Sequence, residues 1–350
     1  MTFELDRLVR RNIRNLKPYS SARSEFVGTA EVFLDANENA FGSPAGGGFN
    51  RYPDPLQAEL KSLIAPLKGV CPSQIFIGNG SDEAIDLLFR LFCEPARDEV
   101  IICPPTYGMY SVSADINDVR IRNVRLTDDF QLDVPSILAG ISDRTKLIFI
   151  CSPNNPTGNL MNREYIVEIA SRFPGICVVD EAYIDFAAEP SMTAQLASLP
   201  NLVVLQTFSK AWGMAGLRVG LAFAGKEIID LMNRVKPPYN VSGIAQRAVI
   251  EALGHEASVR DWTATVLGQR ETLRGSLSRL DLVEKIYPSD ANFILVKVAD
   301  ADAVYRYLVA DGIVVRNRNN VELCDGCLRI TVGTPDENRR LIETLTRIEP

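Results

Sequence analysis

A lysine in an unusual setting is the first residue that could do chemistry. Lys210 lies in the stretch TFSKAWGMAGLR (207–218), directly after the apolar run NLVVLQ. Thr207 and Ser209 precede it closely, and Arg218 follows in the same stretch. Desolvation and nearby cations lower the pKa of a lysine and free its amine for attack on a carbonyl. The stretch therefore predicts a reactive amine, with hydroxyl groups and an arginine nearby that could hold a phosphate.

A turn followed by a helix predicts an anion site. FIGNGSDEAIDLLFRLF indicates a strand, a turn with Gly78 and Gly80, and a helix that begins near Ser81 and Asp82. The free N–H groups and the dipole of a helix N-terminus attract anions. The same residues also fit an ordinary capped helix, with Ser81 or Asp82 as the N-cap. They do not fit a dinucleotide fingerprint, because Glu83 stands where that motif needs glycine.

Other polar or aromatic residues follow apolar runs. Asp180 ends ICVVD, with Tyr183 shortly after it, Asn155 lies in the turn CSPNNPTGN, and Tyr107 follows EVIICPP. A buried carboxylate is costly without a partner, and a cationic ligand nitrogen beside Asp180 would offset that cost. The alternatives are an aspartate that caps the next turn, an ordinary polar turn around Asn155, and a tyrosine that only packs.

A parallel sheet would bring these residues together. Apolar runs alternate with amphipathic helices such as 82–92 and 163–173. Runs of Val, Ile and Leu without alternation are typical of strands buried on both faces, so the pattern predicts an α/β fold with a mostly parallel sheet covered by helices. Ligands of such sheets bind outside the carboxyl ends of the strands. The predicted strands are 74–78, 99–103, 119–126, 146–151, 176–180, 202–207 and 218–224.

The pattern divides the chain into three parts. Residues 41–255 are expected to form the large domain, and residues 256–350 a smaller α+β domain that opens with a long helix. Residues 1–40 are too few to fold alone, so we expect an N-terminal arm that packs on the small domain or on a partner subunit.

Composition excludes several classes of function. The 37 basic and 44 acidic residues give a net charge of −7 without a basic run, which argues against nucleic-acid and membrane partners. The charged N-terminus contains no apolar stretch that could be a signal peptide or a membrane span, so we expect a cytoplasmic protein. The single histidine, His255, makes His-based triads and multi-His metal sites improbable. Cys324 and Cys327 have CxxC spacing but no further ligands, so no metal is expected.

Together these parts describe a pocket for pyridoxal 5′-phosphate. This cofactor needs a lysine that bonds its carbonyl, an acid for its pyridinium nitrogen and an anion site for its phosphate. The chain also resembles the class I and II aminotransferases among the fold-type-I enzymes that use this cofactor. The stretches PNNPTG, VVDEAY and FSKAWGMAGLRVG carry the resemblance, which covers nearly the whole chain.

The resemblance implies a role for each residue. Lys210 would bond the cofactor carbonyl and act as the catalytic base, and Asp180 would hold the proton on the ring nitrogen. Tyr183 and Asn155 would contact the ring 3-oxygen, and Tyr107 would stack on the ring. The phosphate ligands would be the backbone amides of Ser81 and Asp82, together with Thr207, Ser209 and Arg218.

Further stretches resemble the histidinol-phosphate aminotransferase branch of that family: NLKPYSSAR, LDANENAFG, RYPDP, GNGSDEAI, VVRN and GCLRITVGT. This implies that Tyr19, Asn37, Arg316 and Arg329 line the substrate side, and that Tyr52 reaches the partner's site in a homodimer. Arg329 would hold the carboxylate of glutamate or 2-oxoglutarate. Arg316, alone or with Arg329, would meet the substrate phosphate. Arginine suits forked recognition of oxyanions, although a surface ion pair is the alternative for either residue.

The expected reaction is amino transfer from histidinol phosphate to 2-oxoglutarate, by a ping-pong scheme with Lys210 as base. An aromatic aminotransferase or a threonine-phosphate decarboxylase on the same scaffold is the first alternative. A non-catalytic regulator would carry a DNA-binding module, for which the N-terminal segment is too short. A nicotinamide-dependent dehydrogenase would carry the missing glycine fingerprint.

Overall fold

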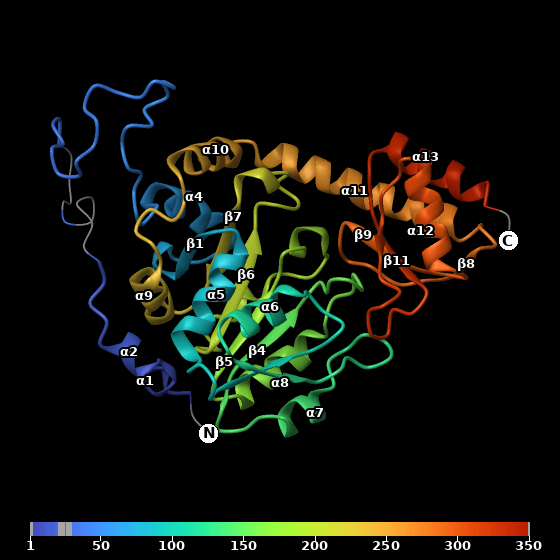
Figure 1. The fold of residues 1–350 in the computed structure, drawn as a ribbon, viewed down its shortest axis with the longest axis horizontal. Helices are drawn as coiled ribbons and strands as arrows, with labels where there is room; N and C mark the ends of the chain where they lie inside the picture. Colours follow the sequence, from blue (N-terminus) through green and yellow to red (C-terminus); the bar gives the residue numbers. More distant parts are fainter. Residues whose placement is uncertain (1–2, 20–24, 26–29, 349–350) are drawn as a thin grey trace.

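Two sheets organise the chain (Figure 1). The computed structural model describes residues 3–19, 25 and 30–348. The large sheet has the strand order β1-β7-β6-β5-β4-β2-β3, and the small sheet has the order β10-β11-β9-β8. The large sheet consists of β1 (Ile75–Asn79), β2 (Glu99–Ile102), β3 (Arg120–Asn123), β4 (Thr145–Cys151), β5 (Ile176–Asp180), β6 (Leu202–Thr207) and β7 (Val219–Phe223). The small sheet consists of β8 (Val283–Ile286), β9 (Phe293–Val298), β10 (Arg316–Asn317) and β11 (Cys327–Thr331).

The centre of the large sheet is parallel, as predicted. Strands β3, β2, β4, β5 and β6 run in one direction, whereas β7 lies antiparallel between β6 and β1. Cys151 at the end of β4 pairs with Asp180 at the end of β5. Thr207 at the end of β6 pairs with Gly220 of β7. The carboxyl ends of the parallel strands therefore meet at one edge of the sheet.

Both faces of the large sheet are buried, which confirms the interpretation of the apolar runs. In β4, Ile148 and Ile150 belong to one core cluster, whereas Leu147 and Phe149 belong to the other. The first cluster also contains residues of α4 (Ala58–Lys68), α7 (Val134–Ala139), α8 (Arg163–Arg172) and α10 (Gly243–Leu253). The second contains residues of α5 (Ser81–Phe92), α6 (Met109–Ile116) and α9 (Lys226–Val235).

A long helix leads to the small sheet. Helix α11 (Glu256–Leu277) runs from beside α10 to the small sheet (Figure 1), and its 22 residues span about 33 Å. Its last turns share a core with β9, β11, α12 (Ala301–Ala310) and α13 (Pro335–Thr346). The domain boundaries expected at 40 and 255 stay a prediction. Within the described residues, no helix combines the length and the apolar composition of a membrane span.

The start of the N-terminal arm packs on the large sheet. Two short helices, α1 (Leu5–Leu8) and α2 (Arg11–Arg14), flank Val9, which is 5% exposed and belongs to the core cluster of α5. The amide of Arg10 donates to the carbonyl of Leu91, at 2.9 Å. The prediction that the arm packs on the small domain is therefore wrong for this segment. A contact between the arm and a partner subunit stays a prediction.

Candidate active site

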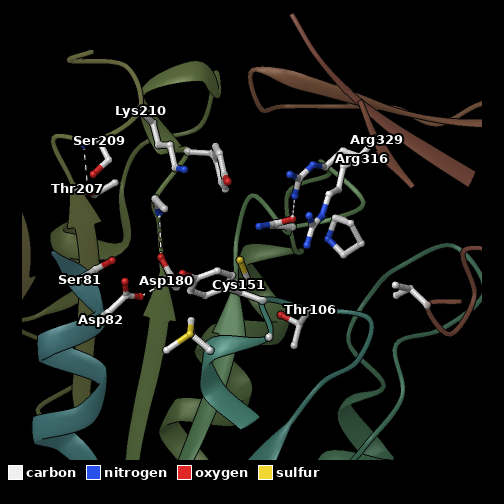
Figure 2. Close-up of a pocket in the computed structure, with 18 of the residues that line it drawn as sticks. Ser81, Asp82, Thr106, Cys151, Asp180, Thr207, Ser209, Lys210, Arg316 and Arg329 are labelled. Atoms are coloured by element: carbon white, nitrogen blue, oxygen red, sulfur yellow. Dashed lines mark hydrogen bonds between the residues drawn. The ribbon is translucent and has the colours of Figure 1, made fainter. Parts of the chain in front are cut away.

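A cavity of about 730 Å³ lies where the strand ends of the large sheet face the small sheet. Figure 2 shows Asp180 at the end of a strand, Lys210 above it, and Arg316 and Arg329 on the side of the small sheet. Every residue predicted to bind the cofactor lines this cavity, together with two predicted substrate residues. They are Ser81, Asp82, Tyr107, Asn155, Asp180, Tyr183, Thr207, Ser209, Lys210, Arg218, Arg316 and Arg329.

Asp180 is a buried carboxylic acid at the end of β5, only 2% exposed. The hydroxyl of Tyr110 donates to its Oδ2 at 2.8 Å, and the amide of Ala182 donates to its Oδ1 at 3.1 Å. Burial raises the pKa of Asp180 to about 6, although both hydrogen bonds and the charge of Lys210 act in the opposite direction. The site thus holds a carboxylate whose negative charge is only partly compensated by the protein.

Lys210 lies three residues beyond the end of β6 and has no carboxylate partner among the described residues. Its Nζ lies 5.4 Å from the centre of the Tyr183 ring. Partial desolvation by the pocket wall lowers the pKa of Lys210, and the charge of Arg329 lowers it further. Both effects favour the neutral amine, which is the nucleophilic and basic form.

The N-terminus of α5 lies against β7. Gly80 is its N-cap, with φ 78°, and makes no side-chain cap bond. Ser81 and Asp82 are therefore the first helical residues, so the alternative that one of them is the N-cap is wrong. A Cβ on Gly220 would collide with the amide nitrogen of Ser81, and a Cβ on Gly80 would lie 2.6 Å from a guanidinium nitrogen of Arg218. The absence of a side chain at Gly220 lets the start of α5 pack directly on β7, and its absence at Gly80 makes room for the guanidinium of Arg218.

An ion pair that the sequence did not predict lies in the corner of the cavity beside the N-terminus of α5. Arg218 lies 3.3 Å from the carboxylate of Asp82, and the Tyr107 hydroxyl donates to the same carboxylate at 3.1 Å. Arg218 adopts φ 55°, a left-handed conformation that non-glycine residues rarely adopt. Such backbone strain is retained where the surroundings fix a side chain in a functional position.

The opposite wall belongs to the small sheet. Arg329 of β11 donates to the amide oxygen of Asn155 and lies 5.1 Å from the centre of the Phe293 ring. The Phe293 ring also makes an edge contact with Tyr183, at 5.1 Å between centroids. The Nε of Arg329 is buried without a hydrogen-bond partner, and desolvation lowers the pKa of its guanidinium. An anion in the cavity would satisfy this donor.

Sequence reasoning missed two residues of consequence. Tyr110 donates a hydrogen bond to Asp180 and stands three residues after Tyr107 in the stretch TYGMY. This spacing, close to the start of a helix, could have indicated that both tyrosines lie near the site. Arg318 lines the cavity and follows Arg316 in the alternating stretch RNRN. The other lining residues not predicted are Thr106, Gly108, Met109, Cys151, Pro156, Ala182 and Val321.

Three residues predicted for the substrate side lie outside the cavity of this chain. Tyr19 and Tyr52 are 77% and 51% exposed, and Tyr52 stacks on Tyr239 at 4.4 Å between centroids. Asn37 is not among the lining residues and has φ 55°. A role for these residues in this chain's own cavity is not supported, and the prediction that Tyr52 serves a partner's site stays open.

The comparisons with known proteins place the chain in a family. Residues 23–345 match the family described as aminotransferase class I and II. The chain belongs to this family. A histidinol-phosphate aminotransferase of Cytophaga hutchinsonii is 54% identical over 345 residues, which cover 99% of each chain.

Solved structures of related aminotransferases share the fold. The structure of the Sinorhizobium meliloti histidinol-phosphate aminotransferase in complex with pyridoxal-5′-phosphate has a TM-score of 0.78 and 26% identity, over 89% of each chain. The L-threonine-O-3-phosphate decarboxylase of Porphyromonas gingivalis also matches, with a TM-score of 0.70 and 23% identity, over 85% of this chain and 90% of the other. The fold of this aminotransferase family is therefore shared with a decarboxylase.

Cys324 and Cys327 are the pair with CxxC spacing. Cys324 and Cys327 are buried free thiols, and the described part of the chain contains no group of three or more His, Cys, Asp or Glu that could hold a metal ion. Burial raises the pKa of Cys324 to about 12 and that of Cys327 to about 11, which favours the protonated thiol over the thiolate that binds metals.

Replacing Asp180 tests the cost of its burial. Because its folded pKa lies above the value of about 3.9 in an unfolded chain, Asp180 contributes stability at low pH that is lost as the pH rises through about 6. We expect cofactor-free Asp180→Asn to exceed the cofactor-free wild type in free energy of unfolding by roughly 1–3 kcal/mol at pH 8. The gain should be smaller at pH 4.5.

Urea unfolding at both pH values measures the difference. Asp261→Asn, at an exposed position on α11, is the matched control and should change the stability little at either pH. An equal gain in stability for Asp180→Asn at both pH values would contradict the conclusion that burial raises the pKa of Asp180.

Proposed function

We propose that the chain is a pyridoxal 5′-phosphate-dependent histidinol-phosphate aminotransferase. It transfers the amino group of L-histidinol phosphate to 2-oxoglutarate and forms imidazole-acetol phosphate and L-glutamate. The observation that carries the proposal is one cavity in which a desolvated Lys210 and a buried Asp180 lie between a helix N-terminus and a wall of arginines. The histidinol-phosphate aminotransferase of Cytophaga hutchinsonii, which is similar to this chain over 99% of its length, supports histidinol phosphate as the amino donor.

The corner at α5 fits the cofactor phosphate. The amides of Ser81 and Asp82 are free helix N–H groups, and Thr207 and Ser209 add hydroxyls on the opposite side. Arg218 supplies the positive charge. The cradle depends on glycines at positions where a Cβ would block the helix amides or the guanidinium. Binding of a phosphate would add a second negative partner for Arg218 beside Asp82.

Asp180 fits the ring nitrogen. When bound, pyridoxal 5′-phosphate supplies a carbonyl that condenses with amines and a pyridinium ring that accepts electrons. A cation beside Asp180 would stabilise its ionised form and so offset the cost of burial. Tyr110 holds the carboxylate in place by the hydrogen bond to Oδ2. Tyr183 and Asn155 would face the ring 3-oxygen, and Tyr107 would lie against the ring.

Lys210 is the base of the proposed reaction. Its lowered pKa leaves more of the amine neutral near neutral pH, so Lys210 would accept the proton from Cα of the donor and hold it for return when the cofactor is bound. The same amine would run these transfers in reverse with 2-oxoglutarate. One set of residues therefore serves two successive half-reactions, and ping-pong kinetics follow.

Lys210→Ala should abolish turnover. We expect a loss of at least about 10³-fold in kcat, because a positioned acid–base group contributes about 10²–10⁴-fold and Lys210 also bonds the cofactor. Glutamate formation from histidinol phosphate and 2-oxoglutarate measures the rate. Lys226→Ala, which removes an exposed lysine paired with Asp230, is the control and should keep wild-type turnover. Turnover of Lys210→Ala within tenfold of the wild type would refute the assignment.

A panel of amino donors tests the substrate. The alternatives on the same scaffold are an aromatic amino acid aminotransferase and a threonine-phosphate decarboxylase. We expect kcat/KM for histidinol phosphate to exceed that for phenylalanine and tyrosine, and no carbon dioxide release from threonine phosphate. A higher kcat/KM for the aromatic amino acids would favour the first alternative. Carbon dioxide release without amino transfer would favour the second.

We also propose that the enzyme is a cytoplasmic homodimer. Val32, Leu34 and Phe41 are 72%, 86% and 102% exposed, so the segment before α4 presents large apolar side chains that a second copy would cover. Tyr52 follows this segment, is 51% exposed and is not among the residues that line the cavity of its own chain. It would complete the substrate side of the partner's site.

Mixing two inactive variants tests this arrangement. Tyr52→Ala and Lys210→Ala homodimers are each expected to have low activity. After unfolding and refolding together, random pairing in a twofold dimer should restore about a quarter of wild-type activity, because one site of each mixed dimer has both residues. A mixture no more active than its components would show that Tyr52 does not serve the partner's site.

A further inference from the structure

An alternating segment brings a third arginine into the cavity. Arg316, Asn317, Arg318 and Asn319 follow one another at β10. Asn317 donates to Oδ1 of Asp302 at 2.6 Å, and Asn319 donates to Oδ2 of the same residue at 3.0 Å. Asp302 lies in the first turn of α12. Each carboxylate oxygen of Asp302 therefore accepts a hydrogen bond from one of the two asparagines, and these bonds hold the segment against α12.

Further bonds hold the backbone of the segment. The amide of Arg318 donates to the carbonyl of Cys327 at 2.9 Å, and the amide of Gly326 donates to Oδ1 of Asn319 at 2.8 Å. Arg316 pairs in register with Arg329 of β11. The two asparagines both bond Asp302, whereas the two arginines both line the cavity.

Arg318 lacks a counter-ion in the described part of the chain. It makes no ion pair with the described residues, and its Nε is buried without a hydrogen-bond partner. Desolvation lowers the pKa of its guanidinium to about 10, and the charges of Arg329 and Arg316 contribute to the decrease. Three cations that repel one another and a buried donor without a partner are costly features. A bound anion would relieve both costs.

The three arginines differ in their place in the cavity wall. After desolvation, the charge of Arg329 is the largest cause that lowers the pKa of Lys210. Arg329 also contacts Asn155. Arg329 is therefore tied to residues of the large sheet, whereas Arg316 and Arg318 line the cavity from the segment at β10.

We propose that Arg318, held by the Asp302–Asn317–Asn319 frame, binds with Arg316 the phosphate of the amino donor and so determines the preference for a dianionic substrate. This inference rests on the proposed function. A phosphate group carries about −1.5 to −2 charges at pH 7 and several acceptor oxygens, so it can satisfy two guanidinium forks at once. A carboxylate held by Arg329 needs only one.

The arrangement also explains how neutral donors are rejected. An aromatic amino acid has no anion at its far end, so its binding would exclude water from Arg318 without supplying an acceptor. An unpaired buried donor costs more than a hydrogen bond gains, which makes this a strong form of discrimination. Arg318 would thus make the enzyme prefer histidinol phosphate to aromatic amino acids as the amino donor.

Arg318→Gln in the holoenzyme tests the proposal. Each half-reaction is followed separately by cofactor absorbance, with histidinol phosphate, unphosphorylated histidinol or glutamate as donor. We expect kcat/KM for histidinol phosphate to fall by about 10- to 100-fold, as for loss of a charged hydrogen bond. The values for histidinol and glutamate should change less than about threefold, because neither donor has a phosphate.

Two further variants separate binding from structure. Arg306→Gln removes the same charge from an exposed position on α12, and all its rates should match the wild type. Arg318→Lys keeps a positive charge without the fork and should recover part of the loss for histidinol phosphate. Equal losses with all three donors in Arg318→Gln would indicate a structural role and overturn the proposal.

Inorganic phosphate keeps the test independent of the assigned reaction. In the holoenzyme the cofactor phosphate occupies the corner at α5, so added inorganic phosphate reports on the second anion site. Calorimetry should show weaker binding by at least about tenfold in Arg318→Gln and no change in Arg306→Gln. If the wild type does not turn over histidinol phosphate, the proposed function fails. Unchanged phosphate affinity in Arg318→Gln would overturn the inference itself.

Discussion

Burying an ionisable carboxylate at the end of β5 costs free energy, and much of the site limits that cost. Tyr110 and Ala182 donate hydrogen bonds to Asp180, and the charge of Lys210 favours the ionised form. These contacts do not suffice, because the pKa of the carboxyl stays above its ordinary value. A ligand cation beside Asp180 would remove the remaining cost. The free protein is therefore less stable at this position than it would be with the ligand bound.

The cavity and the chain as a whole differ in the sign of their charge. The chain carries a net charge of −7, yet five of the residues that line the cavity are lysine or arginine and only Asp82 and Asp180 are acidic. A cationic cleft in an acidic molecule concentrates the field on one opening and attracts small anions there. The proposed substrates and cofactor all carry negative charge.

Much of the site could be predicted because the carboxyl ends of parallel strands meet at one edge. The apolar runs located β4, β5 and β6, and the polar residues after them therefore had to converge. Asp180, Asn155 and Lys210 were found in this way. The ion pair of Arg218 with Asp82 joins residues 136 positions apart, and no local pattern indicates it. Arg318 was missed because it lies beyond the end of β10, where no regular spacing relates it to the cavity.

One aromatic ring joins the two walls of the cavity. Phe293 of β9 contacts Tyr183, which follows the large sheet, and also lies beside Arg329 of the small sheet. A ligand that displaced either neighbour would therefore change a contact of the same ring. Thermodynamic linkage makes such an effect reciprocal, so the factor by which cofactor binding changes substrate affinity equals the factor by which substrate binding changes cofactor affinity. Any coupling carried by Phe293 would therefore act on cofactor and substrate by the same factor.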